Sequence, residues 1–336
     1  MLKVSFILPC FNVAPYIGRC IESIERQDMS QDEYEIICVD DCSPDNSGDI
    51  IRDYQNKYSN IIYHRHEINK TSGGARNTGI DLARGEYIWF VDPDDEIELN
   101  VLNIIYQTAV KRETEILLFN LRHINESGKE TEIRKYFDCE ETISGQEYVL
   151  KYCSKNSLYD VAAHCCCLFK KEFIITQDIR YPEIKSSQDV VFVWKAVLLA
   201  RRMSSINTVC YRYIRRIDSM TGSEGKKKAD ATLSASVLYP FELQRILDTF
   251  EFIDYSFIDT IKRDIVGSVN DDSRSLFKMT SQEVRNLYYG LNEHHTEVDS
   301  LRNYMNRKTR HILNYRMTYF FWRIMVETYK LYGYLK

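Results

Sequence analysis

Four short apolar runs alternate with helical patterns in the first 91 residues, and this alternation most constrains the fold. The runs occupy residues 3–8, 35–40, 60–64 and 86–91. They are apolar throughout rather than at every second position, which is typical of parallel strands covered by helices on both faces. The sequence therefore predicts an α/β fold with a mostly parallel central sheet.

Three helices are predicted between these strands. Apolar residues recur at helical spacing over residues 17–24, and Ser47 is a candidate N-cap for the helix after the second strand. A glycine-rich loop that begins at Thr71 is predicted to open a third helix over residues 75–84. Each strand is thus followed by a helix, as in repeated βα units.

Three carboxylates crowd the end of the fourth predicted strand. Asp92, Asp94 and Asp95 lie within four residues, where like charges repel one another. A hard divalent cation, which prefers oxygen ligands, would explain such crowding. The alternative is a polar turn with Pro93 at its second position.

Other notable residues also follow predicted strands. Phe11 follows the first strand, and Asp40 and Asp41 end the second. Ligands of parallel sheets bind beyond the carboxyl ends of the strands, so these side chains are expected to share one edge with the Asp92 group.

Four motifs in this region carry a resemblance to a known family. They read Ile-Leu-Pro-Cys-Phe-Asn at 7–12, Val-Asp-Asp-Cys-Ser-Pro-Asp-Asn-Ser at 39–47, Gly-Ala-Arg-Asn-Thr-Gly at 74–79 and Phe-Val-Asp-Pro-Asp-Asp at 90–95. In this order and spacing, residues 3–110 resemble the N-terminal half of a family 2 glycosyltransferase with the GT-A fold.

The resemblance implies a nucleotide site and a metal site. The implied nucleotide-binding residues are Pro9, Phe11, Asp40, Asp41, Arg76 and Asp92. The implied ligands of a Mn²⁺ or Mg²⁺ ion are Asp92 and Asp94, with Asp95 beside them. The ion would bridge the two phosphates of a UDP-sugar and stabilise the UDP leaving group.

Each implied role has a plainer alternative. Phe11 stands where the family more often has a tyrosine that stacks on uracil, and otherwise it is a core residue. Asp40 and Asp41 match an acidic pair that would accept the uracil N3–H, and otherwise they form a turn. Arg76 is expected to meet the diphosphate, and otherwise it is a surface arginine.

The catalytic base is expected later in the chain. Residues 182–192 resemble a family segment that usually ends in Glu-Asp before a helix, but Gln188 replaces the glutamate here. Asp189 is the predicted base, which would take the proton of the acceptor hydroxyl, and a helix N-cap is its alternative role. Arg215 or Arg216 would close over the diphosphate, unless they form only a solvated strand end.

The second half continues the α/β pattern and then becomes helical. Strands are predicted at 116–121, 161–169 and 206–214, with a helix at 189–201. We predict a GT-A domain over residues 1–225, with a nucleotide-binding half at 1–110 and an acceptor half at 111–225. Residues 226–336 are predicted to form a helical C-terminal region.

The ten cysteines show no spacing typical of a disulfide framework or a zinc site. The run from His164 to Cys167 lies in a predicted strand, where alternate side chains point to opposite faces. We therefore interpret these thiols as core residues of a protein in a reducing compartment.

The C-terminal tail is strongly basic. Residues 302–336 have a net charge of +7 from eight lysines and arginines against one acid, which leaves −12 on the rest of the chain. Its interleaved aromatic residues are typical of a helix on an anionic membrane surface, although a helix packed on the domain fits equally well. No nucleic-acid-binding signature accompanies the charge.

The chain has no apolar run of about 18 residues and no signal peptide, so a cytoplasmic protein is expected, with peripheral attachment to the plasma membrane as an option. The implied function is an inverting, metal-dependent transfer from a UDP-sugar to a polysaccharide or oligosaccharide acceptor, expected to be lipid-linked. A non-catalytic assembly factor of the same fold is the main alternative. A sugar nucleotidylyltransferase is less consistent, because Pro9 and Phe11 stand where its glycine-rich loop would be. Donor sugar, acceptor and oligomeric state stay open.

Overall fold

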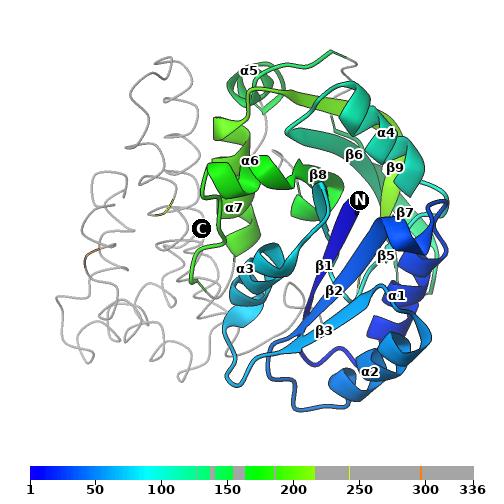
Figure 1. Ribbon diagram of the computed structural model, residues 1–336. Coiled ribbons are helices and arrows are strands. Elements are labelled where there is room, and N and C mark those ends of the chain that lie inside the picture. Colours follow the sequence, from blue (N-terminus) through cyan, green and yellow to red (C-terminus); the bar gives the residue numbers. More distant parts are fainter. Residues whose placement is uncertain are drawn as a thin grey trace, which may run out of the picture. The chain divides into compact units, whose positions relative to one another are not determined.

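The computed structural model describes residues 1–125, 127–136, 141–153, 163–184 and 187–215, with single positions at 242 and 296. The chain divides into two compact units, residues 1–183 with 192–216 and residues 184–191 with 217–336. The first unit is nearly all described (Figure 1). The predicted boundary at 225, the helical region beyond 226 and the basic tail lie outside the described residues.

A single mixed sheet forms the centre of the first unit. Its strands run in the order β3-β2-β1-β4-β8-β6-β9-β5, and β7 pairs with β6. The strands are β1 (Val4–Cys10), β2 (Tyr34–Asp40), β3 (Ile61–Arg65), β4 (Tyr87–Phe90), β5 (Glu96–Ile97), β6 (Ile116–Ile124), β7 (Glu130–Arg134), β8 (Cys167–Lys170) and β9 (Met203–Ile214). The first four strands pair in parallel, which confirms the predicted parallel arrangement of this half.

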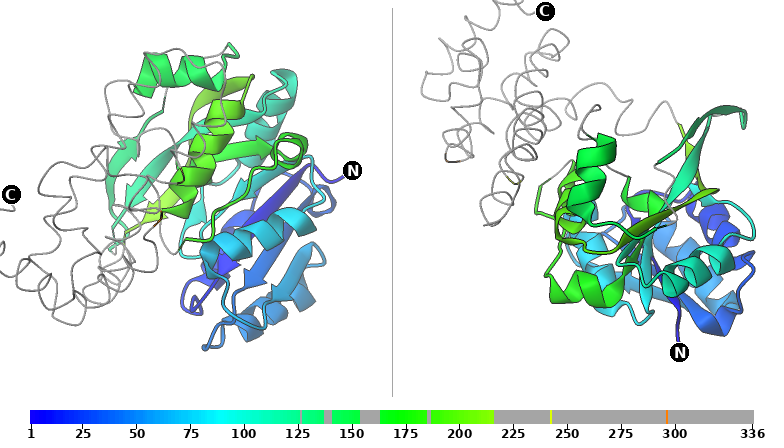
Figure 2. Two further views of the ribbon diagram at one scale, coloured as in Figure 1. Left: turned by 90° about the vertical axis from the view of Figure 1, so that its left-hand side faces the viewer. Right: turned by 90° about the horizontal axis from the view of Figure 1, so that it is seen from above.

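Helices cover both faces of the sheet (Figures 1 and 2). They are α1 (Ile17–Glu25), α2 (Ser47–Lys57), α3 (Thr71–Leu82), α4 (Leu102–Lys111), α5 (Gly145–Tyr148), α6 (Lys171–Thr176) and α7 (Gln188–Leu199). On one face, Phe6 of β1 shares a buried cluster with Ile21 of α1 and Ile105 of α4. The opposite face carries α3, which packs on β1 and β2. No helix among the described residues is long and apolar enough to cross a bilayer.

The contact between α3 and β1 is unusually close. A Cβ atom built on Gly79 would lie 2.3 Å from Cγ2 of Ile7, far inside van der Waals contact. Glycine is therefore needed at this position so that the helix can approach the strand. The second glycine of the Gly-Ala-Arg-Asn-Thr-Gly motif thus has a packing role.

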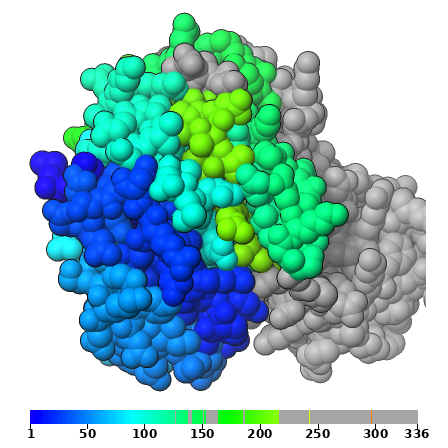
Figure 3. Space-filling model, turned by 90° about the vertical axis from the view of Figure 1, so that its right-hand side faces the viewer, coloured from blue at the N-terminus to red at the C-terminus, as the bar shows by residue number. Residues whose placement is uncertain are grey.

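Strands β6 and β9 bring the second half of the chain onto the same sheet. They pair in parallel from Ile116 with Met203 to Ile124 with Ile214. In the space-filling view, the yellow-green surface of residues near 200–215 lies beside the cyan to green surface of residues near 90–135 (Figure 3). The end of β9 therefore reaches the region that follows β4.

Three local predictions were wrong. Ser47 is the first residue of α2 rather than its N-cap, and its Oγ donates to Asp45 Oδ1 at 2.6 Å. The helix α3 begins at Thr71 and contains Gly73 and Gly74, so these glycines do not form a loop. Residues His164–Cys166 form a 3₁₀ turn, and β8 begins only at Cys167.

The three cysteines of this run are core residues, as predicted, despite the different local structure. Cys165, Cys166 and Cys167 are free thiols buried in the core. Burial raises the pKa of Cys167 well above its usual value, so this thiol is an inert packing group.

Candidate nucleotide-binding site

The parallel register places four chain segments at one edge of the sheet. Cys10 is opposite Asp40, and Asp40 is opposite Arg65, so β1, β2 and β3 end side by side. The residues that follow these strands and β4 therefore meet at their carboxyl ends, where α/β sheets bind ligands.

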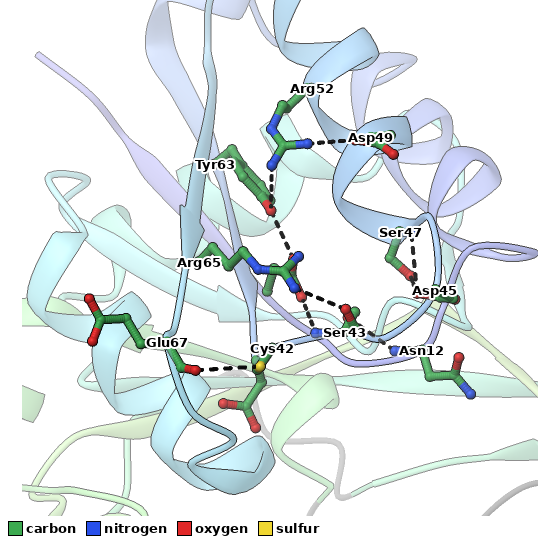
Figure 4. A network of polar contacts seen from close by, with 12 residues as sticks. Asn12, Cys42, Ser43, Asp45, Ser47, Asp49, Arg52, Tyr63, Arg65 and Glu67 are labelled. Carbon is green, nitrogen blue, oxygen red and sulfur yellow. Dashed lines mark hydrogen bonds and ion pairs between the residues drawn. The ribbon is translucent and has the colours of Figure 1, made fainter.

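Phe11 is exposed to solvent on a loop that hydrogen bonds hold in place. Its side chain is 49% exposed, so the alternative of a core phenylalanine was wrong. The backbone N–H groups of the next three residues donate to side chains of the β2–α2 loop and of the first residue of α2: Asn12 to Ser43 Oγ, Val13 to Ser47 Oγ and Ala14 to Asp45 Oδ2, at 3.2, 2.9 and 3.1 Å. Figure 4 shows the bond between Asn12 and Ser43. An exposed ring on a fixed loop is suited to stacking on a flat ligand.

Asp40 is fully engaged by the protein itself. Its Oδ1 accepts the N–H of Ser43 at 2.8 Å. Its Oδ2 accepts the Tyr63 hydroxyl at 2.8 Å and Arg65 Nη1 at 2.7 Å. Tyr63 and Arg65 reach this point from β3, and Ser43 from the loop after β2 (Figure 4). Asp40 therefore fastens the loop to the sheet, and its predicted contact with a nucleoside would have to compete with these bonds.

Asp41 has a different environment. Its Oδ1 lies 2.8 Å from His66 Nδ1 and accepts the N–H of Lys70 at 2.8 Å. Its Oδ2 is buried and has no hydrogen-bond partner among the described residues. Buried carboxylate oxygens normally have donors, so Oδ2 is suited to a donor on a ligand. Of the predicted acidic pair, Asp41 is the member with an available acceptor.

Arg76 is committed to the carboxylate after β4. Its Nη2 lies 2.7 Å from Asp92 Oδ1, and its guanidinium carbon lies 5.2 Å from the centre of the Tyr181 ring. Arg76 is only 7% exposed, so the alternative of a surface arginine was wrong. It holds positive charge beside the edge where a diphosphate is predicted.

Asp92 is kept ionised by its neighbours. His164 Nε2 lies 3.5 Å from Asp92 Oδ1, the oxygen that also meets Arg76. Burial acts to raise the pKa of Asp92, but His164 and Arg76 outweigh it and hold the pKa below its usual value. The side chain is therefore negatively charged, as a ligand of a hard cation needs to be.

Asp95 is buried and bonded through both oxygens. Oδ2 accepts the Tyr211 hydroxyl at 2.8 Å, and Oδ1 accepts the N–H of Ile214 at 2.8 Å. Burial raises the pKa of Asp95 well above its usual value, and the charges of Asp94 and Asp92 add to this shift. These contacts tie the loop after β4 to the end of β9. Direct metal binding by Asp95 would have to share its oxygens with these bonds.

The half-buried Asp94 completes the predicted metal motif. No group of three His, Cys, Asp or Glu side chains suited to a metal occurs in the described part of the chain. A Mg²⁺-type ion commonly binds one or two carboxylates and takes its other oxygens from phosphates and water. Asp92 and Asp94 fit that partial ligand set, with the diphosphate as the natural source of further oxygens.

The remaining predicted residues are placed as follows. Pro9 is buried within β1, opposite Val39. Asp189 lies in the first turn of α7, and the neighbouring Gln188 donates to the carbonyl of Ile184. Arg215 lies 3.6 Å from Glu132 of β7, and Arg216 is outside the described residues. The roles of these residues stay predictions.

Sequence comparison identifies the family. The family described as "Glycosyl transferase family 2" matches residues 5–176, which include β1 to β4 and the Asp92 motif. The chain belongs to glycosyl transferase family 2. The predicted family and its α/β fold are thereby confirmed.

Two relatives of this family 2 chain are poly(ribitol-phosphate) glycosyltransferases by name. The poly(ribitol-phosphate) beta-glucosyltransferase of Bacillus spizizenii is 32% identical over 219 residues, 65% of this chain and 33% of that protein. The poly(ribitol-phosphate) beta-N-acetylglucosaminyltransferase TarS of Staphylococcus aureus is 28% identical over 248 residues, 74% of this chain and 40% of TarS. The chain thus spans well under half the length of either relative.

A solved structure shows the same fold. Residues 1–349 of Staphylococcus aureus TarS, in complex with UDP-GlcNAc, superpose with a TM-score of 0.70 at 22% identity, covering 99% of this chain and 92% of that one. A mannosyltransferase from Pyrobaculum calidifontis, in complex with GDP-Man and Mn²⁺, gives a TM-score of 0.53 at 12% identity, over 98% and 87% of the two chains.

Three residues of the candidate site were assigned no role by the sequence analysis. His66, Tyr211 and His164 contact Asp41, Asp95 and Asp92, respectively. The only sequence signal for His66 was its position two residues after the predicted strand at 60–64. Tyr211 and His164 reach the site from distant segments, which no spacing rule connects to the acidic motifs.

Proposed function

We propose that this chain is an inverting, metal-dependent glycosyltransferase that uses a UDP-sugar as donor. The observation that carries the proposal is Asp41, whose buried Oδ2 offers an acceptor at the carboxyl edge of the sheet. Uracil has a donor at N3, whereas cytosine has only an acceptor there. A fixed carboxylate at this position would therefore select uracil.

The rest of the edge fits the other parts of a sugar nucleotide. Phe11 would stack on the base from its pinned loop. Asp92 and Asp94 would hold the divalent cation that neutralises charge on the departing diphosphate. Arg76 would add a cation close to the same charge. The TarS complex with UDP-GlcNAc, on the same fold, supports a UDP-sugar.

Asp189 is the proposed base. It would accept the proton of the acceptor hydroxyl as the hydroxyl oxygen attacks the anomeric carbon, while the bond from that carbon to UDP breaks. The acceptor is proposed to be a cell-surface glycan polymer, because two relatives act on poly(ribitol-phosphate) by name. A non-catalytic nucleotide-binding protein is the second candidate function. Gln188 favours it, because this residue replaces the glutamate that usually precedes the base in the family.

Calorimetry tests the donor class. UDP, CDP and GDP are titrated into the full chain with Mn²⁺ and with EDTA. We expect binding that prefers UDP and that weakens when EDTA removes the metal. Equal binding of the three nucleotides, or no binding, would refute the UDP-sugar proposal.

An Asp189→Asn variant separates the enzyme from a binding protein. Loss of sugar transfer with unchanged UDP binding is expected for a catalytic base. Transfer at the wild-type rate would remove Asp189 from the mechanism.

A further inference from the structure

The histidine that follows β3 connects Asp41 to the helix α3. His66 is only 4% exposed, and its backbone N–H donates to the carbonyl of Asp40 at 2.9 Å. Its Nδ1 lies 2.8 Å from Asp41 Oδ1, and its Nε2 lies 2.9 Å from Thr78 Oγ1. Both ring nitrogens are therefore engaged, and together with the backbone bond they hold the residue at three points.

The partners of the ring determine its hydrogen-bond direction. A carboxylate oxygen accepts, so Nδ1 carries the proton and donates to Asp41. In the neutral ring, Nε2 then accepts from the Thr78 hydroxyl. Thr78 lies on α3 (Thr71–Leu82), the helix that also carries Arg76.

The bonds at Asp41 are unequally distributed between its two oxygens. Oδ1 receives both His66 Nδ1 and the N–H of Lys70, while Oδ2 has no partner among the described residues. Two donors on one oxygen prevent the carboxylate from rotating about its χ2 angle. The direction in which Oδ2 offers its lone pairs is therefore set by His66 together with the loop at Lys70.

We propose that His66 is a positioning residue that determines nucleobase specificity by orienting Asp41. This inference rests on the proposed function, in which Asp41 Oδ2 accepts the uracil N3–H. The Nδ1–H group fixes the carboxylate, and the fixed carboxylate accepts from uracil but faces an acceptor in cytosine. His66 itself does not touch the base. It fixes the orientation of the acceptor, Asp41 Oδ2. Thr78 holds the other ring nitrogen, Nε2, through its hydroxyl.

Two polar substitutions separate positioning from packing. In His66→Asn, the amide nitrogen lies near the position of Nδ1 and keeps the donor to Asp41. In His66→Gln, the amide reaches the position of Nε2, so the contact with Thr78 is kept and the donor to Asp41 is lost. Both variants remain polar and close in size to histidine, so they test the donor rather than the volume.

The readout is the ratio of UDP to CDP affinity, measured by calorimetry on the full chain with Mn²⁺. We expect His66→Gln to weaken UDP binding roughly tenfold, because it loses one hydrogen bond to a charged group, and to leave CDP binding unchanged. His66→Asn is expected to retain the wild-type ratio within about threefold. Thr78→Val, which loosens the ring from the other side, should lower the ratio in the same direction.

A matched control, His64, lies in β3, two residues before His66. The ring of His64 lies 5.6 Å from that of His66, in an edge contact. We expect His64→Gln to leave the UDP to CDP ratio unchanged. A similar loss in this variant would mean that the strand, rather than the donor to Asp41, controls the ratio, and would overturn the inference.

The outcomes distinguish this inference from the function on which it rests. A wild-type protein with no preference for UDP over CDP would refute the proposed function. A wild-type preference that survives in both His66→Gln and Thr78→Val would overturn only the role of His66. A lower melting temperature with an unchanged ratio would likewise assign His66 to folding stability alone.

Discussion

The hydroxyl of Tyr211 donates to Oδ2 of Asp95 at 2.8 Å and accepts the backbone N–H of Asp92 at 3.1 Å. One side chain from β9 thus holds two members of the acidic motif, although it lies more than a hundred residues later in the chain. The position of the Asp92 carboxylate, and of the metal proposed there, therefore depends on β9.

Tyr211→Phe is expected to weaken this support. The Asp92 N–H and Asp95 Oδ2 would both lose their partner in a buried place, which costs about 1–3 kcal/mol of folding free energy. We also expect Mn²⁺-dependent UDP binding to weaken more than UDP binding in EDTA. Tyr34→Phe is the control, because it removes a hydroxyl contact to Glu25, at 3.3 Å, on another part of the sheet. Equal losses with Mn²⁺ and with EDTA would contradict a link to the metal.

Asp94 and Asp95 are expected to differ sharply in metal binding. Asp94→Asn should remove most of the gain in UDP affinity that Mn²⁺ provides, because an amide is a poor ligand for a hard cation. Asp95→Asn should keep that gain, because its oxygens bond to Tyr211 and Ile214. Calorimetry with Mn²⁺ and with EDTA compares the two variants. Loss of the gain in Asp95→Asn, without a loss of stability, would restore Asp95 as a metal ligand.

The pH dependence of stability is expected to depend on Asp95. Its pKa is raised by burial, so the folded state binds the proton more tightly than the unfolded chain does. This contribution to stability is fully present below the unfolded pKa of about 3.9 and is lost as the pH rises toward the folded pKa. Asp95→Asn lacks this titration and should therefore gain stability relative to wild type as the pH increases. Urea unfolding of both proteins at several pH values provides the measurement. If the free energy of unfolding changes equally with pH in both proteins, Asp95 is not the source of the pH dependence.

Phe11 is expected to affect binding without affecting folding. Phe11→Ala should weaken UDP binding by about 1–3 kcal/mol, the usual value of stacking between an aromatic ring and a base. Its melting temperature should stay close to that of wild type, because the ring is 49% exposed. Phe11→Tyr, which keeps the ring face, is the control and should bind UDP normally. An unchanged affinity in Phe11→Ala would place the base elsewhere.

Gly79→Ala is expected to destabilise the fold. The new Cβ would lie 2.3 Å from Cγ2 of Ile7 in a packed core, and overpacking of this kind costs about 1–3 kcal/mol. Gly18→Ala in α1 is the matched control, since the nearest neighbour of its new Cβ is the Tyr54 hydroxyl at 3.1 Å, a much longer contact. Chemical denaturation compares the two, and equal stability of both variants would show that α3 can shift away from β1.

Several local features could be predicted because their causes are local. The apolar runs that became β1 to β4 and the spacing of Ile17, Cys20, Ile21 and Ile24 needed only neighbouring residues. The prediction for Ser47 failed because a distant residue engages its hydroxyl. Ser47 accepts the N–H of Val13 at 2.9 Å, a bond to another loop that no helix rule anticipates.

The sequence by itself determined the α/β class, the family and the edge at which the acidic motifs gather. The alternation of strands and helices along the chain and the polarity of the residues after each strand are encoded by residues close together in the chain. Only the tertiary structure decided which carboxylate does what. Asp40 and Asp41 are adjacent and chemically identical, yet Tyr63 and Arg65 occupy one while His66 leaves an oxygen of the other available. Asp92 and Asp95 likewise differ in their partners, because His164 and Arg76 contact Asp92 whereas Tyr211 donates to Asp95. The role of a carboxylate is set by the donors that surround it, and those donors come from strands and helices that meet only when the chain folds.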